Sequence, residues 1–333
     1  MPLFTNLKKG AIRLVLEGIV AAGREKAFVG WLENVWRDPT WERNRYYHLK
    51  ESLLASLLLE LRLVQGASLR TINIADQYIA IARRHLGSLD GRHIVELGPG
   101  RNLGAGIAFR YIGAASYSGI ELNVGSDFNT RSTLESVECL ARIKYGTFIN
   151  NFNAEQVGFV PPGSQPSESL LLGDKEIKLV EVGSLTSIDM QGEVADFVYS
   201  NFTLEHIQEP AAMVKEIARL LRPGGVTAHF IDCEDHRDFS RPFEYLTFSD
   251  REWEATYGKA GGRSLWNYQN RYRASDFRRF FEDTGLEILE YTPLRSGVLS
   301  DDLRERLAPR FRAYDLADLQ VVWLMIVARK RLT

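Results

Sequence analysis

A glycine-rich loop preceded by an acid is the part of this sequence best suited to hold a ligand. Residues 96–100 read Glu-Leu-Gly-Pro-Gly and follow the short apolar run at 94–95. Because Gly98 and Gly100 have no Cβ, a ligand can approach the backbone of this loop closely. The small and apolar residues that follow can open a helix, whose first N–H groups favour electron-rich ligand atoms. Taken alone, the pattern is also typical of a structural turn between any strand and helix.

A second acid, Glu121, closes the apolar run at 117–122, about 20 residues after the loop. A carboxylate there can accept two hydrogen bonds, for example from the two hydroxyls of a ribose. The alternative for Glu121 is a strand-end acid that faces water. Glu96 is expected either to orient the loop or to meet the ammonium group of a cofactor, directly or through water.

Candidates for proton transfer follow two later apolar runs. His206 comes after the run at 195–200, and Asp232 and His236 follow the run at 226–231. Histidine and aspartate are usual general bases where a hydroxyl is the nucleophile. We expect His236 to be the base, with Asp232 as the second candidate. His206 is the third catalytic candidate, although it could equally cap or pack its turn.

The residues at the end of the run at 226–231, His229, Asp232, Asp235 and His236, could also form a metal site. Successive strand residues alternate between faces, so His229 and Asp232 diverge unless the strand ends between them. We therefore predict no metal and assign the group to proton transfer or substrate contact.

Residues 265–273 (Leu-Trp-Asn-Tyr-Gln-Asn-Arg-Tyr-Arg) supply candidates for acceptor binding. Asn270, Arg271 and Arg273 can bind a phosphate, a carboxylate or a sugar, with nearby aromatic rings stacking on it. A solvated basic face explains these residues equally well.

The composition indicates an ordinary globular protein. Of 333 residues, 45% are hydrophobic and 25% charged, and a net charge of −2 supplies no field for holding nucleic acid. Two cysteines are too few for a disulfide framework, so we expect a cytoplasmic protein. No run approaches the ~20 apolar residues that span a bilayer. Arg13 and Glu17 interrupt the apolar N-terminus, which argues against a signal peptide.

The pattern of apolar residues divides the chain into two regions. Residues 1–89 are predicted to be helical, with an apolar surface that should pack on the next domain or on a partner chain. The partner could be a second copy of this chain, which would form a homo-oligomer. Strands and helices alternate over 90–333, which predicts an α/β domain with a mostly parallel sheet. Two segments, 124–176 and 232–274, interrupt this alternation and are expected to be insertions that cover the substrate. The predicted strands are 94–97, 117–122, 177–182, 195–200, 226–231, 286–291 and 319–328.

Four local patterns, occurring in order, resemble the class I S-adenosylmethionine-dependent methyltransferases. They are the loop at 96–100, Glu121, the run at 196–201 that leads into Leu-Glu-His-Ile, and the turn Leu-Leu-Arg-Pro-Gly-Gly at 220–225. The resemblance covers about residues 90–331. It implies a Rossmann-like sheet of seven mostly parallel strands with the last one antiparallel, and S-adenosylmethionine as the cofactor.

The resemblance also implies which residues bind the cofactor. They are Glu96, Gly98, Gly100, Asn102, Glu121, Ser184 and Asn201. Ser184 offers a hydroxyl where the family often places an acid near the adenine. Asn102 stands where the family commonly has a third glycine, and asparagine tolerates the left-handed backbone better than other residues with a side chain.

The sequence therefore predicts transfer of a methyl group to an oxygen of a small molecule or saccharide. Two alternatives stay open. The first is an NAD-type oxidoreductase, which is disfavoured because Leu103 occupies the third-glycine position of the dinucleotide fingerprint. The second is a non-catalytic binding protein with a methyltransferase fold, against which Gly98, Gly100 and Glu121 argue.

Overall fold

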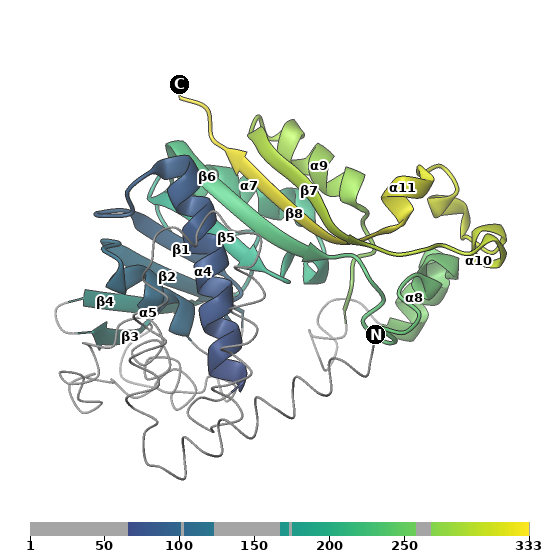
Figure 1. Ribbon diagram of the computed structural model, residues 1–333, viewed down its shortest axis with the longest axis horizontal. Coiled ribbons are helices and arrows are strands. Elements are labelled where there is room, and N and C mark those ends of the chain that lie inside the picture. The colour runs from purple at the N-terminus through teal and green to yellow at the C-terminus, as the bar shows by residue number, and fades with distance from the viewer. Residues whose placement is uncertain (1–65, 101–102, 123–166, 173–174, 258–267, 333) are drawn as a thin grey trace, which may run out of the picture.

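A computed structural model of the protein describes residues 66–100, 103–122, 167–172, 175–257 and 268–332 (Figure 1). The predicted helices before residue 66 and most of the insertion at 124–176 lie outside this part of the chain. The division of the chain at residue 89 therefore stays a prediction, as does a homo-oligomer formed through the N-terminal helices.

An eight-stranded sheet forms the centre of the described chain, in the order β3-β4-β2-β1-β5-β6-β8-β7. Its strands are β1 (His93–Leu97), β2 (Ser116–Glu121), β3 (Ser167–Leu172), β4 (Lys175–Glu181), β5 (Ala195–Asn201), β6 (Leu221–Asp232), β7 (Glu287–Ser296) and β8 (Val321–Arg329). Strand β1 pairs in parallel with β2 and β5, and the parallel pairing continues to β4 on one side and β6 on the other. Strand β8 is antiparallel to both β6 and β7. The predicted Rossmann-like sheet with an antiparallel last strand is confirmed.

Two features of the sheet differ from the prediction. Strand β3, at the end of the predicted insertion 124–176, adds an antiparallel edge to β4. Strand β6 begins at Leu221 rather than at the predicted residue 226. Because Ala195 pairs with Leu221 and Phe197 pairs with Val226, residues 222–225 bulge out of the pairing, with Gly224 at a φ of 78°. The predicted Pro-Gly-Gly turn is therefore a bulge within the strand.

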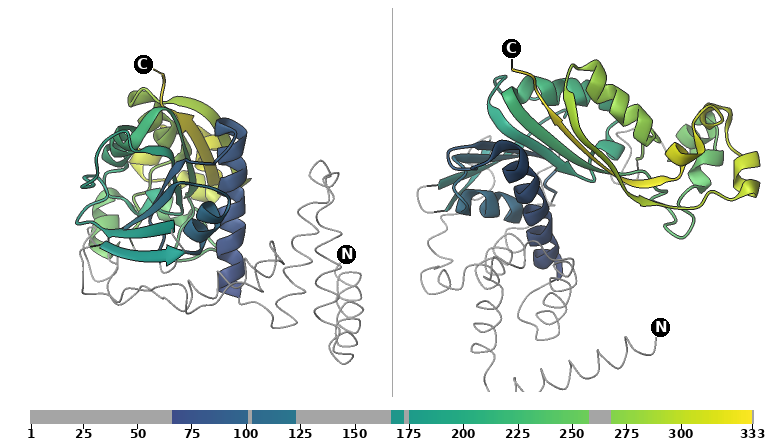
Figure 2. Two further views of the ribbon diagram at one scale, coloured as in Figure 1. Left: turned by 90° about the vertical axis from the view of Figure 1, so that its left-hand side faces the viewer. Right: turned by 45° about the horizontal axis from the view of Figure 1, so that its top comes forward.

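Helices cover both faces of the sheet. Helices α4 (Gly66–Leu86) and α5 (Gly104–Tyr111) share one apolar core with Ile94, whereas α7 (Pro210–Leu220) and α9 (Ala274–Asp283) share another with its neighbour Val95. Successive strand residues point to opposite faces, so two adjacent apolar residues fill two cores. Figure 2 shows α4 lying along one side of the sheet.

Helix α4 is the described part of the predicted N-terminal helical region, and it packs on the α/β domain. The Tyr78 hydroxyl donates to the carbonyl of Ser200 on β5 at 2.6 Å and accepts from the backbone N–H of Phe230 on β6 at 3.2 Å. None of the described helices combines the length and apolar character needed to cross a membrane.

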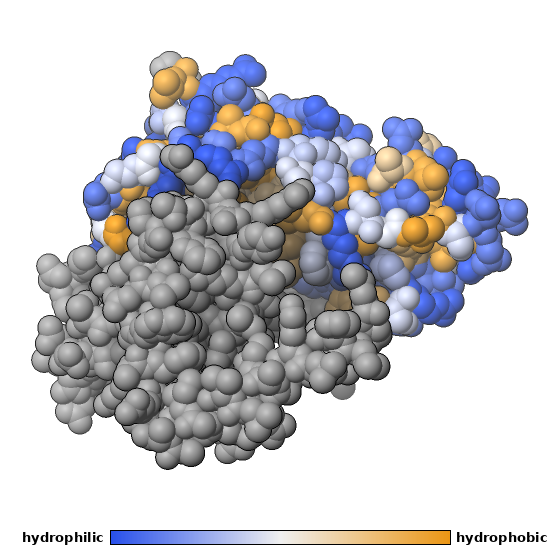
Figure 3. All heavy atoms as spheres, viewed as in Figure 1, coloured by the Kyte–Doolittle hydropathy of each residue, from blue (hydrophilic) through white to orange (hydrophobic). Residues whose placement is uncertain are grey.

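A third apolar core lies at the far end of the β7–β8 pair. This core joins the segment after β6 to the segment between β7 and β8. Both segments form short helices, which we together call the lobe (Figure 1). Its elements are η4 (Glu244–Thr247), α8 (Asp250–Tyr257), α10 (Asp301–Glu305), η6 (Pro309–Phe311) and α11 (Leu316–Leu319). On the face seen in Figure 3 the lobe carries apolar side chains among charged ones. The predicted insertion 232–274 thus folds together with a second segment that the sequence did not mark.

Candidate functional site

The glycine loop after β1 packs against the turn that follows β5. Gly98 and Gly100 have φ angles of 70° and 71°, in the left-handed region that favours glycine. A Cβ on Gly98 would lie 2.7 Å from Oγ1 of Thr203, and the Thr203 hydroxyl donates to the carbonyl of Leu97 at 3.2 Å. Glycine is therefore required at position 98 both for its backbone conformation and for this close approach. It brings the β5 turn next to the loop.

Glu121 lies directly beside the loop, as its spacing predicts. The backbone N–H of Gly100 donates to Oε2 of Glu121 at 3.0 Å, and the N–H of Leu122 donates to Oε1 at 2.8 Å. The half-buried carboxylate is thus held at the end of β2 with both oxygens oriented. Its contact with a ribose stays a prediction.

Glu96 lies beneath the loop, with only 5% of its surface exposed. Its Oε2 accepts hydrogen bonds from the hydroxyls of Tyr117 and of Tyr199, the second at 2.7 Å. The Tyr199 ring in turn packs on Tyr78 of α4, with 4.4 Å between ring centroids. Burial raises the pKa of Glu96 from 4.5 to about 7. Of the two predicted roles, this position favours bracing the loop over contact with a cofactor ammonium group.

The substitution Glu96→Gln is expected to stabilise the protein above pH 7. Because the folded state holds the pKa of Glu96 at about 7 instead of 4.5, the wild type loses stability as pH rises through this window. The loss is on the order of 3 kcal/mol at alkaline pH. A glutamine carbonyl still accepts from both tyrosines and carries no charge. Urea unfolding of both proteins from pH 4 to pH 9 measures the difference.

Several charged or titratable groups surround Glu96, and they could alter this window. They are Tyr117 and Glu121 on β2, Tyr199 on β5 and Tyr78 on α4. Glu121→Gln is the matched control, because it removes a nearby charge and leaves the buried carboxyl in place. A wild type and a Glu96→Gln variant with parallel stability curves would contradict the prediction.

The other predicted cofactor residues have different outcomes. Ser184 follows β4 and lies within a local turn, where its hydroxyl is 2.8 Å from Oγ1 of Thr186 and accepts from the Thr186 N–H at 3.2 Å. Asn201 ends β5, half-buried, before Phe202 with a φ of 54°. Asn102 lies outside the described residues. Their contacts with a cofactor stay predictions.

The three predicted catalytic residues come together where β5 and β6 end. His206 closes the short 3₁₀-helix η3 (Leu204–His206), and its ring centroid is 5.0 Å from that of His236. Nε2 of His236 lies 3.5 Å from Oδ2 of Asp232. The Nδ1 of His206 is 2.7 Å from the carbonyl of Tyr268, so Nδ1–H donates to it and Nε2 keeps its lone pair. The site therefore presents imidazole nitrogens and a carboxylate within one small volume.

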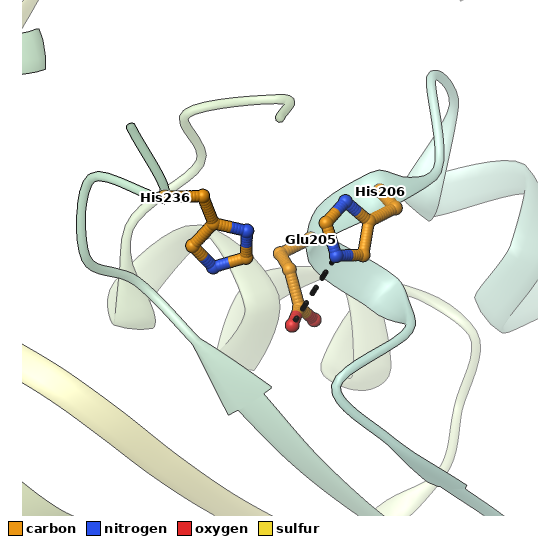
Figure 4. A group of neighbouring side chains, drawn as sticks. All are labelled: Glu205, His206 and His236. Atoms are coloured by element: carbon orange, nitrogen blue, oxygen red, sulfur yellow. Dashed lines mark ion pairs between the residues drawn. The ribbon is translucent and has the colours of Figure 1, made fainter. Parts of the chain in front are cut away.

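Glu205 belongs to the same group, although the sequence did not indicate it. Its carboxylate points between the two imidazoles, with Oε1 at 4.0 Å from Nε2 of His206 (Figure 4). Glu205 is 1% exposed, and neither carboxylate oxygen has a hydrogen-bond partner among the described residues. Burial raises the pKa of Glu205 well above its ordinary value and the charge of Asp232 adds to this effect, while the nearby backbone N–H groups of Glu205 and Asp232 lower it in part. Burial also lowers the pKa of His206. The only signal in the sequence was its place next to His206.

His229 lies apart from this group, inside the sheet. Its Nδ1 is 2.7 Å from Oγ of Ser200 and its Nε2 is 2.5 Å from Oγ1 of Thr227. Burial lowers its pKa to about 3, so the ring is neutral. His229 is therefore a packing residue, in keeping with the prediction that it diverges from Asp232.

The predicted acceptor contacts of Arg271 and Arg273 need correction. Arg271 donates to the carbonyl of Phe248 at 2.6 Å and pairs with Asp250, so it lies at the centre of the lobe. Arg273 is fully buried and donates to the carbonyls of Cys233, Leu319 and Val321 at 2.8, 2.9 and 2.5 Å. The lobe covers this basic run, so these donors serve the interior and not an acceptor.

Asn270 is also buried, but it acts on the catalytic turn. Its Nδ2 donates to the carbonyl of Leu204 at 2.7 Å and to that of Ile207 at 2.9 Å, which are the two ends of the turn that carries Glu205 and His206. The predicted contact with an acceptor is therefore corrected to a role in positioning.

Phe239 is an exposed aromatic residue beside His236. It lies in the loop after β6, 62% exposed, and its ring centroid is 6.0 Å from that of His236. It offers an apolar surface beside the polar group.

A comparison with protein families matches residues 166–228 to the family described as "Methyltransferase domain". No curated protein matches the sequence. The solved structures similar to this chain include two methyltransferases. An S-adenosylmethionine-dependent methyltransferase from Mesorhizobium loti is 16% identical, with a TM-score of 0.41, over 75% of this chain and 96% of the other. A geranyl diphosphate C-methyltransferase from Streptomyces coelicolor is 15% identical, with a TM-score of 0.44, over 88% of this chain and 86% of the other. The family match and the strand order support the expected cofactor, S-adenosylmethionine.

Proposed function

We propose that this chain, a class I S-adenosylmethionine-dependent methyltransferase, methylates an oxygen atom of a small molecule or saccharide. The observation that carries the proposal is the meeting of His206, His236 and Asp232 at the carboxyl ends of β5 and β6. In open α/β sheets ligands bind outside these ends. Thr203, three residues before His206, packs on the glycine loop, so the proton acceptors lie next to the proposed cofactor site.

The cofactor is proposed to lie along the glycine loop. Gly98 and Gly100 expose backbone to it, and Glu121 accepts the hydrogen bonds of its ribose hydroxyls. In this position Glu121 exchanges the N–H of Gly100 for a ligand hydroxyl. S-adenosylmethionine supplies an electrophilic methyl group on a sulfonium.

Methyl transfer is an in-line displacement that depends mainly on alignment, which can contribute ~7–11 kcal/mol. With the cofactor bound, the acceptor oxygen would take the methyl carbon as the bond from that carbon to sulfur breaks. The proton of the acceptor hydroxyl would pass to the pair formed by His236 and Asp232, in which Nε2 of His236 lies 3.5 Å from Oδ2 of Asp232. Phe239 would pack on the apolar face of a ring-shaped acceptor, which favours a saccharide or a similar small molecule.

Calorimetric titration with S-adenosylmethionine, S-adenosylhomocysteine and NAD tests the cofactor half of the proposal. We expect binding of both sulfur compounds and none of NAD. No heat with either sulfur compound would contradict the proposal, and binding of NAD alone would favour an oxidoreductase.

Transfer of label from methyl-labelled S-adenosylmethionine tests the acceptor half. Panels of sugars, phenols and small alcohols are compared with a panel of amines, and we expect the label on oxygen. Label on amines alone would contradict O-methylation. Cofactor binding without any transfer would favour the non-catalytic alternative.

The substitution Glu121→Ala is expected to weaken S-adenosylmethionine binding more than ~10-fold, because it removes charge-assisted hydrogen bonds worth about 1.5–3 kcal/mol. Calorimetry measures the dissociation constant. Glu287→Ala is the control, since Glu287 is exposed at the start of β7, which lies at the opposite edge of the sheet. Unchanged affinity in Glu121→Ala would show that another residue holds the ribose.

A further inference from the structure

Three side chains that commonly ligate metals converge beside the proposed acceptor position. One carboxylate oxygen of Glu205 and one ring nitrogen each of His206 and His236 all lie within 4.8 Å of one another. Two come from the turn after β5 and the third from the loop after β6, so the tertiary structure alone brings them together (Figure 4).

Three buried polar atoms of this group make no hydrogen bond to a described residue, although Nε2 of His236 has Oδ2 of Asp232 at 3.5 Å. Both oxygens of Glu205 and Nε2 of His236 make no hydrogen bond within the described part of the chain. Burying an unpaired carboxylate is unfavourable, and such groups in native proteins usually have a partner, water or an ion. A cation between the three side chains would give one carboxylate oxygen of Glu205 and one nitrogen of each imidazole a partner.

We propose that Glu205, His206 and His236 bind a divalent transition-metal ion of the zinc type. Two imidazoles and one carboxylate form a ligand set that Zn²⁺ uses in catalytic sites, where a fourth position stays open for water or substrate. Ligand atoms around a tetrahedral ion with bonds near 2.1 Å lie about 3.4 Å apart.

The surroundings hold the ligands in orientation. The carbonyl of Tyr268 accepts from Nδ1–H of His206 at 2.7 Å, which directs Nε2 into the group, as the outer partners of metal-bound histidines do. Asn270 holds the carbonyls at both ends of the turn that carries Glu205 and His206. The sequence-based prediction of no metal considered His229, Asp232, Asp235 and His236, a set that shares only His236 with the present one.

The chemical role of the ion rests on the proposed function, whereas its binding does not. The acceptor hydroxyl would bind at the open coordination position of the metal ion, which would lower the pKa of the hydroxyl. The proton would then pass to Asp232, 3.5 Å from His236, and the oxygen would take the methyl group as the bond to sulfur breaks. In this arrangement His236 is a ligand and Asp232 is the proton acceptor of the pair.

Titration of the metal-stripped protein with Zn²⁺ tests the site directly. We expect one ion per chain, and visible absorption bands when Co²⁺ replaces Zn²⁺. Glu205→Gln and His236→Ala should each weaken Zn²⁺ binding at least ~10-fold. His85→Ala is the control, because His85 lies 2.6 Å from Glu290 in a histidine–glutamate pair far from the site in sequence. It should bind Zn²⁺ as the wild type does.

Thermal unfolding with and without Zn²⁺ provides a second measurement on the same samples. Zn²⁺ should raise the melting temperature of the wild type and of His85→Ala, but not that of Glu205→Gln. A wild type that binds no Zn²⁺, or a Glu205→Gln variant that binds it equally well, would overturn the inference. S-adenosylmethionine binding is measured in parallel. If the wild type binds S-adenosylmethionine but not Zn²⁺, only the metal site is rejected. If the wild type does not bind S-adenosylmethionine, the proposed function is rejected.

Discussion

Replacing Arg273 with methionine is expected to lower the free energy of unfolding by about 3 kcal/mol. The fully buried guanidinium donates to four backbone carbonyls, those of Cys233, Asp318, Leu319 and Val321, and also to the hydroxyl of Tyr245. Methionine fills similar space but donates no hydrogen bond, so of these carbonyls that of Cys233 keeps the Tyr245 hydroxyl as its donor and the others lose the one that Arg273 supplies. The relief of no longer burying a charge offsets only part of the loss. Urea unfolding measures the effect.

Arg278→Met is the matched control. Arg278 lies on α9 five residues later, its side chain is 55% exposed, and it pairs with Glu282 across one helical turn. Exposed pairs of this kind contribute about 0.3–0.5 kcal/mol. Equal losses in both variants would contradict an interior role for Arg273. If Arg273→Met were as stable as the wild type, the sequence-based prediction that Arg273 contacts the acceptor would be favoured again.

Replacing Gly98 with alanine is expected to weaken S-adenosylmethionine binding about 100-fold, because small misplacements in a site can have effects of this size. The new methyl group would lie 2.7 Å from Oγ1 and 2.9 Å from Cγ2 of Thr203, so either the loop or the β5 turn must move. The backbone φ of 70° adds strain for any residue with a Cβ. Calorimetry with S-adenosylmethionine measures the affinity.

Gly91→Ala separates the collision from the backbone strain. Gly91 has a φ of 71°, and a Cβ there meets no atom of the described chain within 4 Å. It should lower stability by about 1 kcal/mol and leave cofactor affinity unchanged. A Gly98→Ala variant that binds as well as Gly91→Ala would show that the contact with Thr203 is unimportant to the site.

The two corrected arginines and Asn270 connect the lobe to the site. Arg271 holds the lobe together, Arg273 ties the start of α9 to β8, and Asn270 holds the turn of Glu205. The segment therefore acts on the proposed chemistry through position rather than contact. Substitutions in the lobe core should consequently disturb the site even where they touch none of its residues.

The sequence determined the sheet and the region expected to hold the cofactor. The seven predicted strands are present. Apolar runs bounded by glycine, proline and acids are local patterns, and they indicate strands without knowledge of distant contacts. The relation of Gly98 and Gly100 to Glu121 could also be predicted, because parallel neighbouring strands place their carboxyl ends at one edge of the sheet. The meeting of His206 with His236 follows from the same geometry, since β5 and β6 are parallel neighbours.

Only the tertiary structure decided which polar residues face the site and which are buried. His236 follows a strand and Arg273 precedes a helix, so local sequence does not distinguish them. In the structure Arg273 is fully buried, whereas His236 remains partly exposed at the site. Glu205 points inward because Asn270, distant in sequence, holds its turn at both ends. Burial and side-chain direction depend on which distant segments pack together. The sequence therefore determined where the strand ends converge, and the packing of the lobe decided which side chains remain there to do chemistry.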